Sequence, residues 1–95
     1  MRFTVEKVLY FASQDKRLHV AESEEFRCTD LHHIVTKEVA SGNLRKCGSD
    51  DSGEYYECTS DGLIKLYELK ISWRRQNGMS TEREEAELKR LRLSA

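Results

Sequence analysis

Cys28, His32 and His33 are the residues whose types and spacing bear most directly on chemistry. Cys28 and His32 form a C-x3-H arrangement, and His33 is adjacent. A thiolate and an imidazole at this spacing can ligate zinc, but a structural zinc site takes four ligands, usually as two close pairs. The other thiols, Cys47 and Cys58, are too far apart in the sequence to form a second close pair. We therefore expect no metal and no cofactor.

The same cysteine and histidine types would also suit a thiol nucleophile activated by an adjacent base. The sequence offers no Gly-rich strand-to-helix turn, no paired catalytic carboxylates and no phosphate-binding loop to accompany them. We therefore predict that the chain is not an enzyme and has no catalytic residues. Without an export signal, the three cysteines are expected to be reduced thiols.

The charge balance restricts the possible partners. The chain has 95 residues, of which 38% are hydrophobic and 35% charged, and its formal net charge is −1. Domains that owe their affinity to phosphate contacts are often strongly basic, so nucleic-acid binding here would need locally segregated charge. The sequence has neither a run of about 18 apolar residues nor a signal peptide. We expect one cytoplasmic domain with no membrane segment.

Apolar spacing predicts the elements that position these residues. Thr4 is suited to cap a helix from Val5 to about Ser13. Residues 18–20 can form a short strand and residues 21–26 a short acidic helix. In an alternative reading, residues 16–28 form an additional hairpin.

A second helix is predicted over residues 29–41, capped by Thr29 or Asp30 and stopped by Gly42. Its inward face is expected to consist of apolar side chains at helical spacing: Leu31, Ile34, Val35 and Val39. A hairpin with a longer loop, GSDDSG, follows. Strand alternation turns Leu44, Tyr56 and Cys58 toward the helices, and Tyr55 and Glu57 away from them.

Two helices complete the prediction. Thr59 caps the first, which ends at Asn77-Gly78 and has an apolar face of Leu63, Leu66, Tyr67 and Ile71. Residues 80–93 form the second, in which acids precede bases, an order that complements the helix dipole. Thr81 and Glu84 fit a capping box at its start.

The stretches VASGNLRK and GEYYECTSDGLIKL resemble the winged-helix domain of small bacterial, archaeal or viral transcriptional regulators, over about residues 28–76. The first looks like a recognition helix entering a wing strand, and the second like the other wing strand followed by a Thr-capped helix. The resemblance implies an α+β, mostly helical fold: a winged helix-turn-helix with a two-stranded wing and an extra C-terminal helix. Residues 1–78 would form the domain and residues 79–95 a charged helix or tail.

The resemblance also implies duplex DNA binding through the helix at residues 29–41, in support of transcription regulation. With the apolar face inward, the outward side chains able to reach base edges or phosphates are His32 or His33, Thr36 and Lys37. Arg45 and Lys46 at the start of the wing would extend this surface if they lie beside Lys37.

The wing also suggests a different function. Its acids outnumber its two bases, and Asp50, Asp51 and Glu54 crowd the tip, where they would repel phosphates. Asp, Ser and Gly are also the ordinary residues of a turn without proline. The alternative prediction is a protein–protein interaction module, such as a viral or mobile-element accessory protein that binds a host protein.

The C-terminal helix is too short to be stable alone in water, so it must dock on something or fray. Like regulators of this family, the chain is expected to form a homodimer, with Leu88, Leu91 and Trp73 in the contact. The alternative is a solvated tail.

Overall fold

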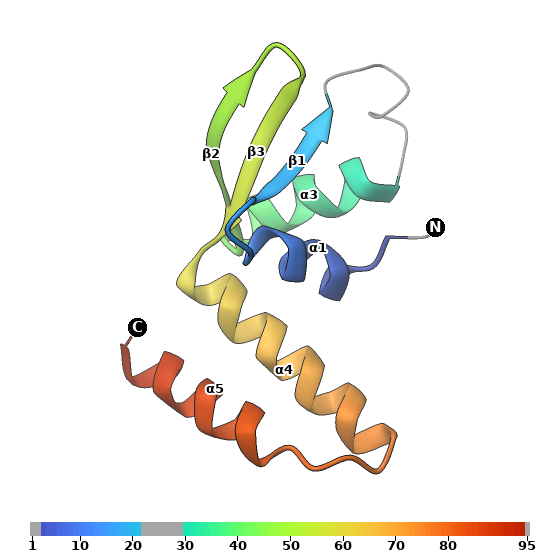
Figure 1. Ribbon diagram of the computed structural model, residues 1–95, viewed down its shortest axis with the longest axis vertical. Coiled ribbons are helices and arrows are strands. Elements are labelled where there is room, and N and C mark those ends of the chain that lie inside the picture. The colour runs from blue at the N-terminus through green and yellow to red at the C-terminus, as the bar shows by residue number, and fades with distance from the viewer. Residues whose placement is uncertain (1–2, 22–29, 95) are drawn as a thin grey trace.

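The computed structural model describes residues 3–21 and 30–94. In chain order the elements are α1 (Val5–Ala12), β1 (Leu18–Ala21), α3 (Asp30–Ala40), β2 (Leu44–Asp50), β3 (Gly53–Cys58), α4 (Ser60–Gln76) and α5 (Glu82–Ser94). Figure 1 shows the sheet with α1 and α3 in one half of the molecule and α4 with α5 in the other. The chain therefore has the predicted α+β fold. Every helix in the described ranges is too short or too polar to cross a bilayer.

Part of the sequence prediction concerns residues outside the described ranges. The short helix predicted over residues 21–26, the possible cap Thr29 and most of the alternative hairpin at 16–28 lie outside them. Cys28, the thiol of the C-x3-H arrangement, also lies outside them.

Helix α1 supplies much of the core. The Thr4 hydroxyl accepts a hydrogen bond from the Lys7 backbone N–H at 3.2 Å, which caps the helix as predicted. Val8, Leu9 and Ala12 are fully buried on one side of the helix. They pack with the buried leucines and valine of the other elements, namely Leu18, Leu31, Val35, Leu44 and Leu66.

The sheet has the strand order β1-β3-β2, and both pairings are antiparallel. The predicted strand at residues 18–20 is confirmed, and it pairs with β3, so that Leu18 lies opposite Tyr56. Leu44 is buried, and Tyr56 and Cys58 pack against the core, as strand alternation predicts. The sheet therefore has an inner face toward the helices and an outer face on the opposite side.

The hairpin turn is tighter than the sequence suggested. Strand β2 extends to Asp50 and β3 begins at Gly53, so only two residues connect them. Asp50 Oδ1 accepts hydrogen bonds from the Ser52 N–H at 2.8 Å and the Ser52 hydroxyl at 2.6 Å, which closes the turn. A bulge at Cys47 shifts the register, so that Gly48 rather than Cys47 lies opposite Tyr55.

Helix α3 buries a charge where an apolar residue was expected. Leu31 and Val35 are buried and Ile34 packs against the core, but Val39 is 40% exposed, so its predicted inward position is wrong. Glu38, 1% exposed, lies inward instead. Glu38 is three residues after Val35 and seven after Leu31, which places it on the same helical stripe.

The end of α3 and the start of α4 are joined directly. Thr59 Oγ1 accepts from the Gly62 N–H at 3.1 Å, as predicted for a cap, and donates to the Gly42 carbonyl at 2.6 Å. The Thr59 N–H donates to the Asn43 carbonyl at 3.1 Å. A Cβ on Gly62 would lie 2.0 Å from that carbonyl oxygen, so this close approach requires glycine. Gly42, with φ of 81°, provides the predicted stop.

Helix α5 packs along α4 of its own chain (Figure 1). Leu88 is 8% exposed, and it lines the same groove as Ile71 of α4. Ion pairs join the two helices on either side of this contact: Arg74 with Glu84, Arg75 with Glu85 and Arg92 with Glu68. The predicted α4 end at Asn77-Gly78 is confirmed. The C-terminal helix therefore packs against α4 of the same chain.

Candidate nucleic-acid interface

The exposed side of α3 carries most of the residues predicted to bind DNA. His33, Thr36 and Lys37 are exposed there, and their spacing of three and four residues places them on one side of the helix. His32 is half-buried, and its ring centroid lies 6.0 Å from that of His33. His33, rather than His32, is therefore the histidine available for contact.

The two bases of β2 are paired with acids of β3. Arg45 donates to Glu57 Oε1 from Nε at 3.0 Å and from Nη2 at 2.6 Å. Lys46 Nζ lies 2.9 Å from Glu54 Oε1, and this hydrogen bond, with a second from the Tyr56 hydroxyl, lowers the pKa of Glu54. Both bases therefore have part of their charge neutralised.

Arg45 and Lys46 also point to opposite faces of the sheet. Successive strand residues alternate, and Lys46 shares the side of buried Leu44, which faces the helices. Arg45 lies on the outer face. The strip of Lys37, Arg45 and Lys46 considered from the sequence is therefore divided between two surfaces.

Arg17 is a second outer-face base that the sequence-based site did not include. Its Nε lies 3.4 Å from Glu57 Oε2, and its Nη1 donates to the Gln14 carbonyl at 3.2 Å. Its φ of 62° places it in the left-handed region, which is uncommon for a residue other than glycine. Only the pairing of β1 with β3 brings Arg17 to Glu57, and no local sequence signal indicates that pairing.

At the hairpin tip, Ser52 lies between Asp50 and His19, which differs from the order of a hydrolytic triad. Ser52 Oγ donates to Asp50 Oδ1 at 2.6 Å and lies 3.1 Å from His19 Nε2. In a hydrolytic triad the histidine accepts the serine proton and the aspartate orients the histidine. Here the serine proton is directed to Asp50. The Ser52 hydroxyl, followed by the Tyr55 hydroxyl, lowers the pKa of Asp50 to about 2.

The two cysteines in the described ranges, Cys47 and Cys58, have different environments. Cys58 Sγ donates to the Leu9 carbonyl at 3.1 Å, and burial raises the pKa of this thiol to about 11. Cys58 is therefore a neutral thiol at physiological pH, whereas Cys47 is exposed. Within these ranges, no three Cys, His, Asp or Glu side chains are grouped to hold a metal ion.

The residues predicted for a dimer contact have different environments. Leu88 is buried against α4 of its own chain, so it presents little surface to a second copy. Leu91 is half-buried, and Trp73 is 51% exposed. Of the three, Trp73 presents the largest free apolar surface.

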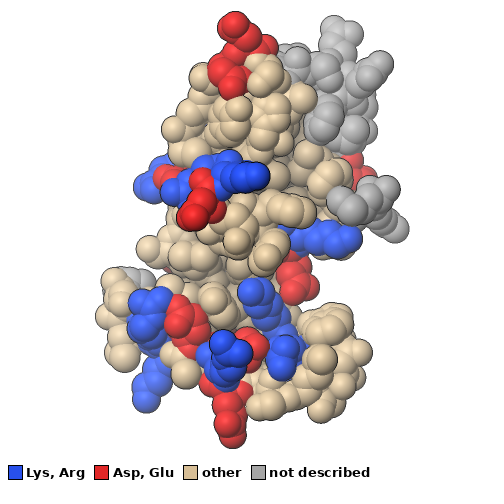
Figure 2. Space-filling view, viewed as in Figure 1, with Lys and Arg blue, Asp and Glu red and all other residues tan. Residues whose placement is uncertain are grey.

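Comparison of the chain with protein-family models, with curated proteins and with solved structures finds no match. The charge distribution is therefore the main guide to function. Figure 2 shows acids at the tip of the hairpin, and bases interspersed with acids over the base of the sheet and over the helices. Among the described residues, the face seen in Figure 2 therefore has no broad basic patch.

Proposed function

We propose that this chain is a winged-helix protein that binds duplex DNA through the exposed side of α3 and acts in transcription regulation. The carrying observation is the solvent-facing row of His33, Thr36 and Lys37 on a helix that leads directly into the β2–β3 hairpin. The elements follow one another in the order α1, β1, α3, β2, β3, and β1 pairs with the edge of β3 that β2 does not occupy. This arrangement supports the same proposal. In DNA-binding winged helices, one helix lies in the major groove.

Each side chain of this row has a distinct role. Lys37 neutralises a phosphate and contributes to affinity on any sequence. Thr36 and His33 carry hydrogen-bonding groups that can reach base edges, which is where sequence is read. Affinity and sequence preference are therefore separable by mutation.

In this proposal, the β2–β3 hairpin adds no DNA contact to that made by α3. Lys46 is paired with Glu54, and Asp50 and Asp51 stand at the tip. Because carboxylates repel phosphates, the tip stays away from the DNA backbone. We expect few phosphate contacts and a shallow dependence of affinity on salt.

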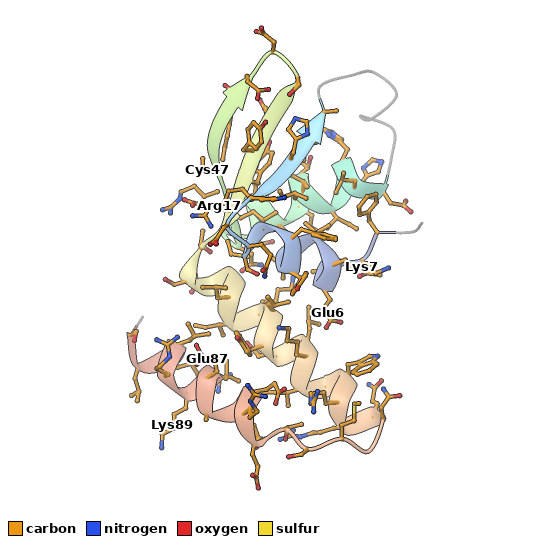
Figure 3. All side chains as sticks on the ribbon, in the orientation of Figure 1. Glu6, Lys7, Arg17, Cys47, Glu87 and Lys89 are labelled. Atoms are coloured by element: carbon orange, nitrogen blue, oxygen red, sulfur yellow. The ribbon has the colours of Figure 1, made fainter. Side chains whose placement is uncertain are left out.

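Fluorescence anisotropy with a labelled mixed-sequence duplex, at low and physiological salt, tests this proposal. Lys37→Ala should weaken binding to every sequence and reduce the salt slope by about 0.9. Lys89→Ala is the matched control, because Lys89 is an exposed lysine on α5, remote from α3 (Figure 3). Absence of binding by the unmodified chain at low salt, or equal effects of the two variants, would overturn the proposal.

Base reading has a separate test. His33→Ala should change the preference among duplexes in a binding-site selection while leaving the salt slope unchanged. His32→Ala serves for comparison, since His32 is half-buried. An unchanged preference for His33→Ala would remove His33 from the base-contacting set.

We also propose that the protein binds as a homodimer, with Trp73 and the half-buried Leu91 in the contact. The exposed indole of Trp73 supports this, because aromatic side chains are enriched in interfaces. Sedimentation velocity should show a dimer for the chain and a monomer for Trp73→Ser. Val39→Ser, a loss of exposed apolar surface on α3, should remain dimeric. A monomer at every concentration would contradict the dimer.

The acidic hairpin tip favours a second candidate, a protein-interaction module. Asp50 remains ionised because its pKa is about 2, and Asp51 beside it is exposed. A partner with a basic surface would complement this tip. If so, Asp51→Asn should weaken a reconstituted complex, and raised salt should do the same. A complex that is insensitive to both changes would exclude the tip.

A further inference from the structure

The outer face of the sheet carries two adjacent rows of side chains. In the first row, His19 of β1 lies opposite Tyr55 of β3, and Gly48 of β2 lies on the other side of Tyr55. In the second row, two residues along the strands, Glu57 of β3 lies opposite Arg45 of β2. Arg17 precedes β1 and reaches Glu57 from the other side. Figure 3 labels Arg17 at this part of the sheet.

The aromatic row is held in place by hydrogen bonds. The centroids of the His19 and Tyr55 rings are 4.8 Å apart, and the rings are tilted by 42°. The Tyr55 hydroxyl donates to Asp50 Oδ2 at 2.7 Å, and His19 Nε2 lies 3.1 Å from Ser52 Oγ. The Tyr55 hydroxyl and His19 Nε2 therefore each have a partner that holds the ring in place, and reorganisation on binding would be small.

Open space lies beside this aromatic pair. Gly48 has no side chain, and a Cβ placed on it would meet no atom of the described residues within 4 Å other than those of its two chain neighbours. The bulge at Cys47 is what brings this glycine opposite Tyr55. A planar group can therefore approach the Tyr55 ring from the β2 side.

The second row contains two guanidinium groups and one carboxylate. Arg45 binds Glu57 Oε1 and Arg17 faces Glu57 Oε2, so one positive charge is left over. Arg45 Nη1 and Arg17 Nη2 donate to no side chain or backbone group in the described ranges. Both arginine side chains are substantially exposed, and their remaining N–H groups are suited to a phosphate, which guanidinium groups bind well.

We propose that this outer face binds a single nucleic-acid strand, with an unpaired base stacked on the Tyr55–His19 pair and its phosphodiester at Arg17 and Arg45. Two strand residues separate the rows by about 7 Å, within reach of a base and its own backbone. A duplex hides its base faces, whereas a single strand offers them to aromatic side chains. The site lies on the other side of the sheet from the helices, so it is distinct from the α3 surface proposed for duplex DNA.

Glu57 has a specific role in this site. It holds both guanidinium groups in position, and its charge opposes the incoming phosphate. Removing that charge while keeping the shape, as in Glu57→Gln, should therefore strengthen single-strand binding about threefold to tenfold at low salt. A purely structural carboxylate would produce no such gain.

Anisotropy titrations of labelled oligothymidylate and oligouridylate test the proposal and distinguish DNA from RNA as the source of the strand. Tyr55→Leu should weaken binding at least about fivefold, from the lost stacking. Arg17→Gln should weaken binding and reduce the salt slope by about 0.7. Lys16→Gln, the same loss of charge at the adjacent exposed residue, is the control and should have little effect.

Gly48→Val is a second test of the stacking site, for the case in which Tyr55→Leu does not fold. It fills the open space beside Tyr55, has room for its Cβ and does not disturb the ring itself, so it should fold normally and block the base. No binding of either oligonucleotide at low salt, or normal binding by Tyr55→Leu, Gly48→Val and Arg17→Gln, would overturn the inference. Loss of single-strand binding in Lys37→Ala would also overturn it, by placing the strand on α3. Duplex binding by these outer-face variants reports separately on the proposed function.

Discussion

Lys65 Nζ of α4 lies 2.5 Å from Oε1 of Glu38, and this ion pair joins the buried side of α3 to α4. The lysine side chain is 38% exposed, whereas the glutamate side chain is 1% exposed. Glu38 Oε2 has no hydrogen-bond partner among the described residues. Lys65 is therefore the cation that compensates the buried charge of Glu38, whose Oε1 also accepts a hydrogen bond from Asn43 Nδ2 at 3.5 Å.

Lys65→Met should destabilise the protein by about 3–5 kcal/mol, because it leaves a buried carboxylate without its cation. The double variant Lys65→Met with Glu38→Leu should recover most of this loss, since a buried ion pair is often replaceable by apolar residues. Urea unfolding followed by circular dichroism measures both free energies. A single-variant loss below half a kilocalorie, about the range for surface substitutions, would show that Glu38 is solvated.

Gly62→Ala should destabilise the protein although alanine is the better helix former. Helix propensity alone predicts a gain of about 1 kcal/mol, but the new Cβ would lie 2.0 Å from the Asn43 carbonyl oxygen. The backbone of α4 must move, at a cost of about 1–3 kcal/mol or more. Gly48→Ala, where the Cβ meets nothing within 4 Å, is the control. A gain in melting temperature for Gly62→Ala would disprove this close approach.

Cys58 should make stability fall at high pH. Burial raises its pKa from 9.0 to about 11 in the folded protein, so between these values the unfolded chain releases the proton that the folded chain retains. Stability is then lost as pH rises from about 9 to about 11. Unfolding midpoints of the wild type and of Cys58→Ser should therefore converge over this range. A difference that is constant from pH 8 to 11 would contradict the raised pKa.

Leu88→Ala should cost about 2–5 kcal/mol, the usual range for a buried leucine, because Leu88 packs against α4. Leu93→Ala, at a position that is 78% exposed, should change stability by less than about 0.5 kcal/mol. Thermal unfolding of the two variants provides the comparison. Similar losses for both would mean that α5 is docked through a different face.

Local patterns predicted most of the elements. Thr4 and Thr59 are side-chain caps, Gly42 and Gly78 adopt positive φ at helix ends, and each of these signals lies within a few residues of the feature that it specifies. The exposed side of α3 followed from helical spacing for the same reason. Apolar spacing wrongly predicted that Val39 would be buried. Val39 lies one residue before the end of α3, and no core residue of the described ranges covers it.

Features that depend on distant pairings were not predictable from one sequence. The contact of Glu57 with Arg17 requires β1 to lie beside β3, across more than thirty intervening residues. The burial of Glu38 requires Lys65 to arrive from α4. The burial of Leu88 likewise requires α4 to lie beside α5, which the spacing of leucines within α5 does not specify. In each case, tertiary contacts determined what the local residue types left open.

The hydrogen bonds of Thr59 to Gly42 and Asn43 close residues 44–58 into a loop whose two ends are fixed together. The helices on either side therefore keep their relationship whatever happens at the far end of that loop. Residues inserted between Asp51 and Ser52 would lengthen the turn at the end of the hairpin opposite to this junction. The turn is thus the part of the hairpin that can vary, and a different tip would confer a new specificity on the same helices and sheet.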